Sequence, residues 1–595
     1  MNITERVESL REWMRDNNVA AYVITNNDPH NSEYTADYWK CREWISGFNG
    51  SAGTAVVTLD SAALWTDSRY FLQAEEQLAG TPFRLMRDGL KETPSIEAWL
   101  EQELERGSVI GFTASVTPMD EFRVYEQNSH FEARTFDDPF KQIWEERDLF
   151  SIARIVTLPL SVAGKSAKKK IAELIARFEA DFDSETAYLI TDLSEIAWLL
   201  NLRGDEIEYN PLFEANVIIW RGKCVLFVES DNIAKPIKEY LTKQGVIQYD
   251  SWELKTVLKN LAKQNVVFVM SPSTNVAVVS HFENPIFRPS YLALPKSIKN
   301  ERETAGFRQA MLYDGVALVR FRRWLDEKVA DGSIAQETEC TISDRLLAFR
   351  AENREFLGLS FATIAGYAAH GAIVHYEAVP ETAAQLRNEG LLLLDSGAQY
   401  TCGTTDITRT IALGALTDEE RKVYTLVLKG HIALSRVRFP EGTLGIQLDL
   451  AARYAMWQEG YDFGHGTGHG VGSCLCVHEG PQQIRKDLRA ATQVPFQAGM
   501  TITNEPGIYL AGKFGVRIEN ILLTVPADTT SFGSFLAFDA LTLCPIDIAP
   551  IAIEMLDETE KEWLNAYHNV VRERLLPLLS DEADRQWLEE ATKPL

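Results

Sequence analysis

The sequence predicts a mixed α/β (α+β) fold with three domains. The chain has 595 residues, which is more than one hydrophobic core normally holds. The order helix, strand and hairpin occurs twice in the first half, and several strand-like runs follow a long helix in the second half. We therefore expect two similar N-terminal α/β domains, residues 1–153 and 154–298, and a third domain, residues 299–595, with a C-terminal extension at about 545–595.

The first domain is predicted from local patterning. Residues Ile3 to Met14 have helical periodicity and lead into an apolar, strand-like run from Ala20 to Thr25. The runs Ser51–Leu59 and Ala62–Thr66 follow as a hairpin that turns at Leu59-Asp60-Ser61. A helix and a hairpin beside an apolar strand indicate an α/β domain.

The second domain repeats this order. A helical stretch, Lys168–Phe182, precedes the run Ala187–Thr191, which resembles Ala21–Thr25 of the first domain. The runs Ala215–Trp220 and Cys224–Val228 form a second hairpin with a short turn between them. The shared order of elements indicates a duplication.

The third domain begins with a long helix, Asn300–Val329, with acidic residues near its start. Its strands are predicted from four runs: Leu391–Leu394, Thr408–Leu413, Met500–Asn504 and Val516–Val525. A last helix begins near Asp557, its predicted N-cap, with Glu560 three residues later, and its apolar face includes Trp563 and Tyr567. This face could pack on its own domain or contribute to a dimer.

The composition indicates a globular protein that binds neither nucleic acid nor membranes. Lys and Arg number 59 against 85 Asp and Glu, so the net charge of −26 repels nucleic acid and anionic lipid. No apolar run reaches the roughly 18 residues of a membrane span, and the N-terminus lacks the pattern of a secretory signal. Seven scattered cysteines are typical of a reducing compartment. We therefore expect a cytoplasmic protein whose partners are small molecules, peptides or copies of itself.

Four acidic residues lie on strand-like runs of the third domain, where burial is expected: Asp395, Asp406, Glu505 and Glu519. Burying a single unpaired carboxylate is costly, so a buried cluster needs strong compensation. Two divalent cations would balance four carboxylates. Any one of these acids alone is more commonly a cap, a turn residue or a surface residue, and Glu519 could pair with Arg517 on the same strand face.

One histidine fits the same scheme. His469 lies in the segment Phe463–Gly472, which has too many glycines for a helix, so we expect a loop to hold it. Four carboxylates and one imidazole form an oxygen-rich set that suits Mn²⁺ better than a structural Zn²⁺. Bridging carboxylates would hold two ions about 3.5 Å apart, with a shared hydroxide as nucleophile. Taken alone, His465, His375 and His478 are each more commonly structural.

Two further patterns carry no cofactor prediction. The alternating glycines between 466 and 472 do not match the dinucleotide-binding motif. Cys474 and Cys476 lie near His478, but no second cysteine pair follows, and His478-Glu479 lacks the second histidine of the helical zinc-protease motif. We interpret these two cysteines as packing residues.

The candidate ligands lie in recognisable motifs: Asp395-Ser-Gly-Ala-Gln-Tyr400, Gly403-Thr-Thr-Asp406, His465-Gly-Thr-Gly-His469-Gly-Val-Gly472, Glu505-Pro-Gly-Ile-Tyr509 and Val516-Arg-Ile-Glu-Asn520. These motifs resemble the metal-binding motifs of aminopeptidase P, the Xaa-Pro aminopeptidase family of the pita-bread metallopeptidases. Three N-terminal motifs resemble the long three-domain cytosolic form: Ile45-Ser-Gly-Phe-Asn-Gly-Ser-Ala-Gly-Thr54, Trp65-Thr-Asp-Ser-Arg-Tyr-Phe-Leu-Gln73 and Glu195-Ile-Ala-Trp-Leu-Leu-Asn-Leu-Arg-Gly204. The resemblance covers nearly the whole chain and implies a pita-bread catalytic domain at residues 299–595.

The resemblance implies a dinuclear metal-dependent aminopeptidase. Such an enzyme hydrolyses the N-terminal Xaa-Pro bond of peptides and releases the first residue, by attack of a metal-bridging hydroxide. The resemblance implies that Asp406 and Glu519 bridge two divalent ions and that Asp395, His469 and Glu505 complete the ligand set. Manganese is the family's usual ion, with Zn²⁺ or Co²⁺ as alternatives, and homodimers form partly through the C-terminal region.

Catalytic roles are also implied by the resemblance. Glu505 would carry the proton of the attacking hydroxide, and His375 and His478 would contact the substrate and the oxyanion. The resemblance also implies three supporting positions: His465, Tyr509 and Arg517. Cys402 and Cys474 beside the motifs are small departures from the family pattern, and neither removes a ligand.

Two alternatives stay open from the sequence. A prolidase would use the same ligands but accept only Xaa-Pro dipeptides, and the chain length and N-terminal motifs favour the aminopeptidase. Some pita-bread relatives bind proteins after losing their metal ligands, but all five ligand positions are intact here.

Overall fold

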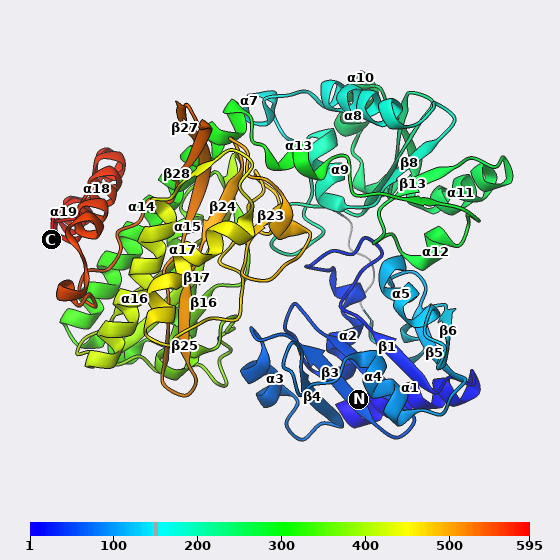
Figure 1. Cartoon of the computed structure of the whole chain (residues 1–595), viewed down its shortest axis with the longest axis horizontal. Helices are drawn as coiled ribbons and strands as arrows, with labels where there is room; N and C mark the ends of the chain where they lie inside the picture. The colour runs from blue at the N-terminus through cyan, green and yellow to red at the C-terminus, as the bar shows by residue number, and fades with distance from the viewer. Residues whose placement is uncertain (148–152) are drawn as a thin grey trace. The chain divides into compact units, whose positions relative to one another are not determined.

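The computed structural model describes residues 1–147 and 153–595, which form two compact units (Figure 1). The first unit contains residues Met1–Leu160 and Lys165–Leu292, and the second contains Ser161–Gly164 and Ala293–Leu595. Two separate six-stranded sheets lie within the first unit. The domain boundaries at 153 and 298 stay a prediction.

The first sheet has the strand order β4-β3-β2-β1-β5-β6. Strand β2 is antiparallel to both of its neighbours, β1 and β3, whereas the remaining neighbouring strands are parallel. The helix α1 (Ile3–Asp16) precedes β1 and begins at the N-cap Asn2. The strand bounds are β1 Ala21–Ile24, β2 Thr54–Thr58, β3 Ala62–Thr66, β4 Phe83–Arg87, β5 Ser108–Thr113 and β6 Phe131–Phe136.

The second sheet repeats the first. Its order is β12-β11-β10-β8-β13-β14, with antiparallel pairing at the same two positions and parallel pairing elsewhere. The helix α8 (Ala167–Asp181) precedes it. The strand bounds are β8 Ala187–Ile190, β10 Ala215–Trp220, β11 Lys223–Val228, β12 Val246–Asp250, β13 Phe268–Met270 and β14 Ile286–Phe287. The predicted similarity of the two α/β domains is confirmed.

The second hairpin differs from prediction by one residue. Strand β11 begins at Lys223 rather than Cys224, because Lys223 pairs with Trp220 and leaves a two-residue turn. Both turn residues, Arg221 and Gly222, have positive φ angles of 49° and 66°. This is the turn geometry that matches the twist of a hairpin, and glycine adopts it without strain.

The second unit begins with the long helix α14 (Glu301–Ala330). Asn300 caps it by accepting from the backbone N–H of Glu303, whose side chain accepts from the N–H of Asn300 in return. Figure 1 shows α14, α15 (Glu339–Ala351), α16 (Asp418–Ser435) and α17 (Gly445–Gln458) alongside the strands of this unit. Mixed helices and antiparallel strands agree with the predicted catalytic domain.

Several small sheets form the strand layer of the second unit. Three strands pair in the order β16-β17-β20, and four pair in the order β21-β28-β27-β24. Their bounds are β16 Ile364–Tyr367, β17 Leu391–Ser396, β20 Ile407–Ala412, β21 Arg438–Pro440, β24 Thr501–Asn504, β27 Asn520–Thr530 and β28 Gly533–Ala540. A further three strands pair in the order β15-β18-β19, with bounds β15 Phe356–Leu359, β18 Ala398–Tyr400 and β19 Gly403–Thr404. Two short antiparallel pairs are β22 Gly468–Gly470 with β23 Glu479–Ile484, and β25 Gly507–Leu510 with β26 Phe514–Arg517.

Two elements of the second unit differ from their predicted form, and both differences change where site residues lie. The run Val516–Val525 is not one strand, because β26 ends at Arg517 and β27 begins at Asn520, in a different sheet. Glu519 therefore lies in a break between two strands. His469 lies in the short strand β22 rather than in a loop, although His465 is in the predicted loop.

The C-terminal helix α18 (Glu558–Leu575) has the predicted capping box of Asp557 and Glu560. Its apolar face packs on its own unit, because Leu564, Tyr567 and Val571 are at most 7% exposed. Val570 of the same helix is 45% exposed, and a contribution of this helix to a dimer stays a prediction.

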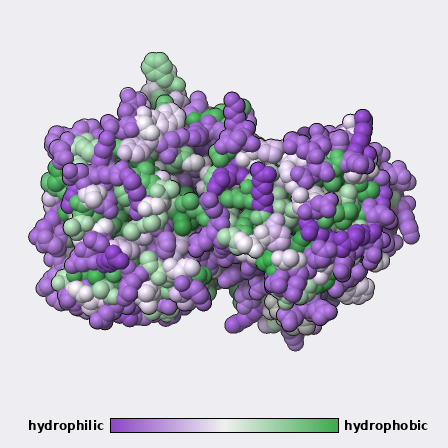
Figure 2. Space-filling view, turned by 90° about the horizontal axis from the view of Figure 1, so that it is seen from below, coloured by the Kyte–Doolittle hydropathy of each residue, from purple (hydrophilic) through white to green (hydrophobic). Residues whose placement is uncertain are grey.

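The surface is largely polar. Figure 2 shows a face on which hydrophilic side chains predominate and hydrophobic ones lie in small groups. Among the described residues, no helix is both long enough and apolar enough to cross a membrane.

Candidate metal centre

Two predicted ligands come from neighbouring strands. Asp395 lies near the end of β17 and pairs in register with Thr408 of β20. Asp406 comes directly before β20, so it lies beside Asp395 at the same end of the strand pair. Both side chains are buried, with 7% and 4% of their residue surface exposed.

Glu519 is brought to the same place by the break between β26 and β27. Its backbone N–H donates to the carbonyl of Thr408 at 3.0 Å, and the Thr408 hydroxyl donates to Glu519 Oε2 at 2.8 Å. Thr408 was not among the predicted site residues. It is two positions after Asp406, and side chains two apart on a strand share a face, which is the signal that could have identified it.

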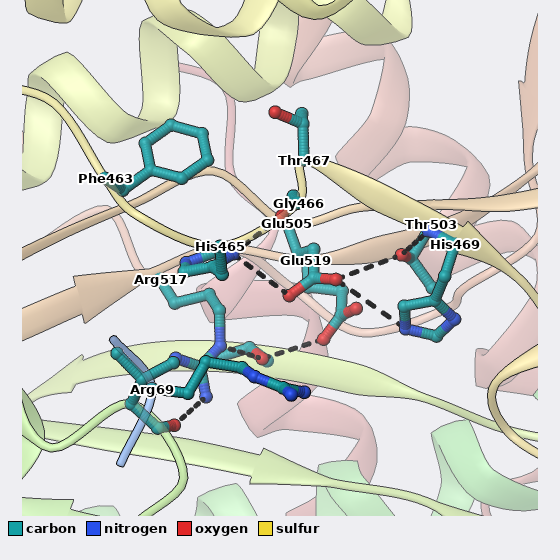
Figure 3. Close-up of polar contacts among 12 residues, drawn as sticks. Arg69, Phe463, His465, Gly466, Thr467, His469, Thr503, Glu505, Arg517 and Glu519 are labelled. Carbon is teal, nitrogen blue, oxygen red and sulfur yellow. Dashed lines mark hydrogen bonds and ion pairs between the residues drawn. The ribbon is translucent and has the colours of Figure 1, made fainter. Parts of the chain in front are cut away.

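His469 and Glu505 complete the group. His469 Nε2 is 3.5 Å from Asp406 Oδ2 and 3.6 Å from Glu505 Oε1. Its Nδ1 lies 3.0 Å from the carbonyl of Gly470, so Nδ1 carries the proton and Nε2, on the side of the acids, is the nitrogen that could bind a metal ion. Figure 3 shows His469, Glu505 and Glu519 directed toward a common centre.

Glycine at position 468 lets this strand approach Glu505. A Cβ atom on Gly468 would lie 1.9 Å from the carbonyl oxygen of Thr503, which is closer than any side chain could pack. The hydroxyl of Thr503 accepts from the backbone N–H of His469 at 3.0 Å and donates to Glu505 Oε1 at 3.4 Å. The glycine-rich segment thus holds its histidine by close backbone packing.

The charges of this cluster are not balanced by the protein. Burial, and then the neighbouring carboxylates, raise the pKa of Asp406 and of Glu519 well above the usual range. Burial also raises the pKa of Glu505 to about 7. Asp395 Oδ1 is buried without a hydrogen-bond partner. Such oxygens are stabilised by nearby cations.

The residues present fit divalent metal ions. Ligand atoms of Asp406, His469 and Glu519 all lie within 4.8 Å of one another. The unpartnered oxygen of Asp395 and the carboxylate of Glu505 adjoin this trio, which gives four carboxylates and one imidazole. This donor set is typical of Mn²⁺ and similar ions.

The three predicted supporting residues form one hydrogen-bonded chain. Arg517 donates to Asp395 Oδ2 at 2.6 Å and to the Tyr509 hydroxyl at 2.7 Å, which lies 2.7 Å from His465 Nε2. Arg517 therefore pairs with Asp395, and the alternative pairing with Glu519 is wrong. Strand β26 ends at Arg517, so Glu519 does not share its strand face.

The two remaining histidines flank the cluster in different ways. The ring of His478 is 4.3 Å from that of His469, with the two planes at 88°. His375 follows Val374, whose carbonyl accepts from Arg517 Nη2 at 3.2 Å. His375 thus belongs to a segment that the Arg517 side chain holds.

Comparisons with known proteins match this architecture over the whole chain. The profile of metallopeptidase family M24 matches residues 305–526, and the C-terminal region of peptidase M24 matches 534–595. Profiles of the creatinase/prolidase N-terminal domain match residues 6–143 and 146–303. The chain therefore belongs to metallopeptidase family M24 and is a metallo-aminopeptidase of that family.

Similar proteins carry more specific names. A probable Xaa-Pro aminopeptidase P of Laccaria bicolor is 39% identical over 100% of this chain and 94% of its own length. Xaa-Pro aminopeptidase 1 of Dictyostelium discoideum is 37% identical over 100% and 97%. The crystal structure of an X-prolyl aminopeptidase from Caenorhabditis elegans, described as a cytosolic enzyme with a di-nuclear active site, matches with a TM-score of 0.94 and 33% identity over the full length of both chains.

Proposed function

We propose that the chain hydrolyses the N-terminal Xaa-Pro bond of peptides and releases the first residue, using two divalent metal ions. The observation that carries this proposal is the buried carboxylate cluster, which the protein does not neutralise. The full-length likeness to Xaa-Pro aminopeptidases supplies the substrate class.

Asp395, Asp406, His469, Glu505 and Glu519 would hold the ions, with Asp406 and Glu519 as the residues shared between them. When bound, such ions polarise the scissile carbonyl and lower the pKa of a water molecule toward neutrality. The oxygen-rich donor set favours Mn²⁺, with Zn²⁺ and Co²⁺ as competitors. Elemental analysis of active protein tests the stoichiometry, and full activity where only one ion can bind would overturn the two-metal proposal.

The surrounding residues would each have a distinct task. The Glu505 carboxylate would accept the proton of the attacking water and return it later in the reaction. His478 beside His469 would donate to the oxyanion, and His375 would contact the bound peptide. Arg517 and Tyr509 would fix Asp395 and His465 through the hydrogen bonds described above.

A prolidase is the second candidate because its ligand set is the same. The chain's full-length match to aminopeptidases, including both N-terminal domains, favours the aminopeptidase. Metal-reconstituted protein should therefore cleave an Xaa-Pro-Yaa peptide and leave the matched Xaa-Pro dipeptide largely intact. Cleavage of the dipeptide alone would identify a prolidase.

We also propose a cytoplasmic homodimer. The Caenorhabditis elegans relative is described as cytosolic, and the seven scattered cysteines of this chain are typical of a reducing compartment. Most of the apolar face of α18 is buried, whereas α17 has a row of exposed apolar residues, so α17 is the candidate surface: Leu450, Tyr454 and Trp457 are 49%, 60% and 43% exposed at helical spacing. Sedimentation of the parent and of Tyr454→Glu tests this, and a monomeric parent at micromolar concentration would contradict the dimer.

A further inference from the structure

Arg409 is a buried cation on the side of β20 that faces away from the carboxylates. Thr408 and Thr410 point toward the site, where their hydroxyls bond Glu519 and Arg517. Side chains alternate along a strand, so Arg409 points to the opposite face, among the core residues that pack with Ile407 and Ile411. Only 3% of its surface is exposed.

The guanidinium of Arg409 makes six hydrogen bonds, and all six acceptors are neutral oxygens. The acceptors are the carbonyls of Thr408, Glu519, Cys544 and Pro545, the side-chain oxygen of Asn520 and the hydroxyl of Tyr567. A buried charge without an acidic partner is costly, so its five N–H groups need this full set of acceptors. The arrangement gathers four separate segments around one side chain.

One nitrogen of Arg409 contacts both Glu519 and Thr408, the residue whose hydroxyl donates to the Glu519 carboxylate. Nη1 donates to the carbonyl of Thr408 at 2.9 Å and to the carbonyl of Glu519 at 2.6 Å. Thr408 is the residue whose hydroxyl bonds Glu519 Oε2. The two backbone bonds therefore fix the distance between Glu519 and the hydroxyl that orients its carboxylate.

The other nitrogen reaches the C-terminal helix. Nη2 donates to the Tyr567 hydroxyl at 2.9 Å, and this hydroxyl can donate onward to the carbonyl of Thr542 or Cys544, each at 3.0 Å. Tyr567 is 7% exposed and stacks on Trp563 of the same helix. Helix α18 is thus connected to Glu519 through a single guanidinium.

We propose that Arg409 is a positioning residue that couples α18 to Glu519 and so sets the affinity of the centre for divalent ions. The inference rests on the proposed role of Glu519 as a metal ligand. Residues that orient metal ligands typically change metal affinity about 10–100-fold when they are altered. The C-terminal region would accordingly be part of the metal site, although it supplies no ligand.

The test compares metal binding in four proteins. Arg409→Lys keeps the charge but carries its three donors on one nitrogen, so it cannot replace bonds that Arg409 makes from three separate nitrogens. Tyr567→Phe removes one hydroxyl at the helix end of the connection. Tyr424→Phe is the matched control, because its hydroxyl is equally buried and donates to a carbonyl of the same C-terminal segment, Asp547, at 2.7 Å, without bonding Arg409. Mn²⁺ titration of metal-free protein, circular dichroism and kcat at rising Mn²⁺ are measured for each.

We expect Arg409→Lys to bind the more weakly held of the two Mn²⁺ ions about 10–100-fold less tightly than the parent does. Its kcat should return toward that of the parent when the Mn²⁺ concentration is raised. Tyr567→Phe should lose about three- to tenfold in Mn²⁺ affinity, because one of the six hydrogen bonds of the guanidinium is lost, while Tyr424→Phe matches the parent. Parent-like Mn²⁺ binding by a folded Arg409→Lys protein would overturn the proposal. If that variant does not fold, equal affinities of the two Tyr→Phe proteins would overturn it instead.

The outcomes also separate this inference from the proposed function. A parent that binds Mn²⁺ but does not cleave Xaa-Pro peptides would refute the function, whereas the affinity comparison would still stand. An active parent whose variants all bind Mn²⁺ equally would refute only the role of Arg409.

Discussion

Buried acids lie at two neighbouring places in the second unit, one holding Glu479 and the other the four acids of the candidate centre, and the two places differ in what neutralises them. Glu479 is contacted by two lysine ammoniums, Lys296 Nζ at 3.1 Å and Lys299 Nζ, with all three side chains at most 6% exposed. Its strand pairs Glu479 with Gly470, next to His469. The four acids of the candidate centre, in contrast, have one guanidinium among the described residues, Arg517, and of these four acids it bonds Asp395.

The difference teaches that burial alone does not identify a metal site. A carboxylate with its own ammonium partners is complete without a ligand, and its removal should damage the fold. A carboxylate cluster with too little positive charge is incomplete, so its members can be removed with a loss of activity rather than of folding. Four predictions follow from this contrast.

The largest effect is expected at Glu519. Glu519→Ala, like Asp406→Ala, should reduce turnover to background, because each removes an oxygen ligand that we place between the two ions. The metal-free variant should be at least as stable as the parent, since a carboxyl group that burial and its neighbours disfavour in the ionised form has been removed. Steady-state kinetics, metal content and thermal unfolding measure this. Near-normal kcat with full metal content would show that the residue does not bridge the ions.

Glu479→Ala should show the reverse. It removes the carboxylate that both buried ammoniums contact, so we expect a loss of about 3–5 kcal/mol in the free energy of unfolding. Urea unfolding measures this. Glu419→Ala is the control, because its 2.9 Å ion pair with Lys513 is exposed and worth less than about 1 kcal/mol. Similar losses in the two variants would remove the contrast between buried and exposed pairs.

His478 lies between the two groups, since it precedes Glu479 and packs on His469. Loss of an oxyanion donor lowers kcat about 10²–10³-fold, so His478→Ala should do so while retaining both ions and a similar KM. His375→Ala should instead raise KM at least as much as it lowers kcat. Metal analysis must accompany the kinetics. A kcat within about threefold of the parent, with both ions bound, would contradict the role of His478.

The smallest effect is a pH dependence of metal-free protein. Glu505 has a folded pKa of about 7 against an ordinary 4.5, so the folded state binds its proton more tightly than the unfolded state. Its contribution to stability is present at low pH and is lost as pH rises toward and through 7, on the order of 3 kcal/mol. Urea unfolding from pH 5 to 8, with chelator or with saturating Mn²⁺, measures the difference. A constant difference would show that the acids do not hold protons without metal.

Local features were predictable because their determinants lie within a few residues. The capping box at Asp557–Glu560 depends on two side chains three positions apart. The duplicated sheet order was predictable because the same succession of helix, strand and hairpin occurs twice. The acids were identified because charged residues at apolar runs need an explanation.

Contacts between distant segments were not predictable in this way. Nothing near Arg517 in the sequence indicates that it pairs with Asp395, 122 positions away, rather than with Glu519. The strand break before Glu519 depends on β27 joining a different sheet from β26, which is decided by tertiary packing. A charged residue in a strand-like run, such as Arg409, is visible in the sequence. Its six hydrogen-bond acceptors are not, because they lie in separate segments of the second unit.

The connection from Arg409 to helix α18 has a consequence for biosynthesis. Arg409 and Tyr567 are 158 positions apart, and Tyr567 comes 47 positions after Asn520. A ribosome adding about 5–20 residues per second needs roughly 2–10 s to cover that last interval. During this time a nascent chain already contains every proposed metal ligand but lacks the helix that steadies Glu519. Tight loading with metal would therefore follow translation of α18, and chains cut short before it would circulate as poorly metallated protein.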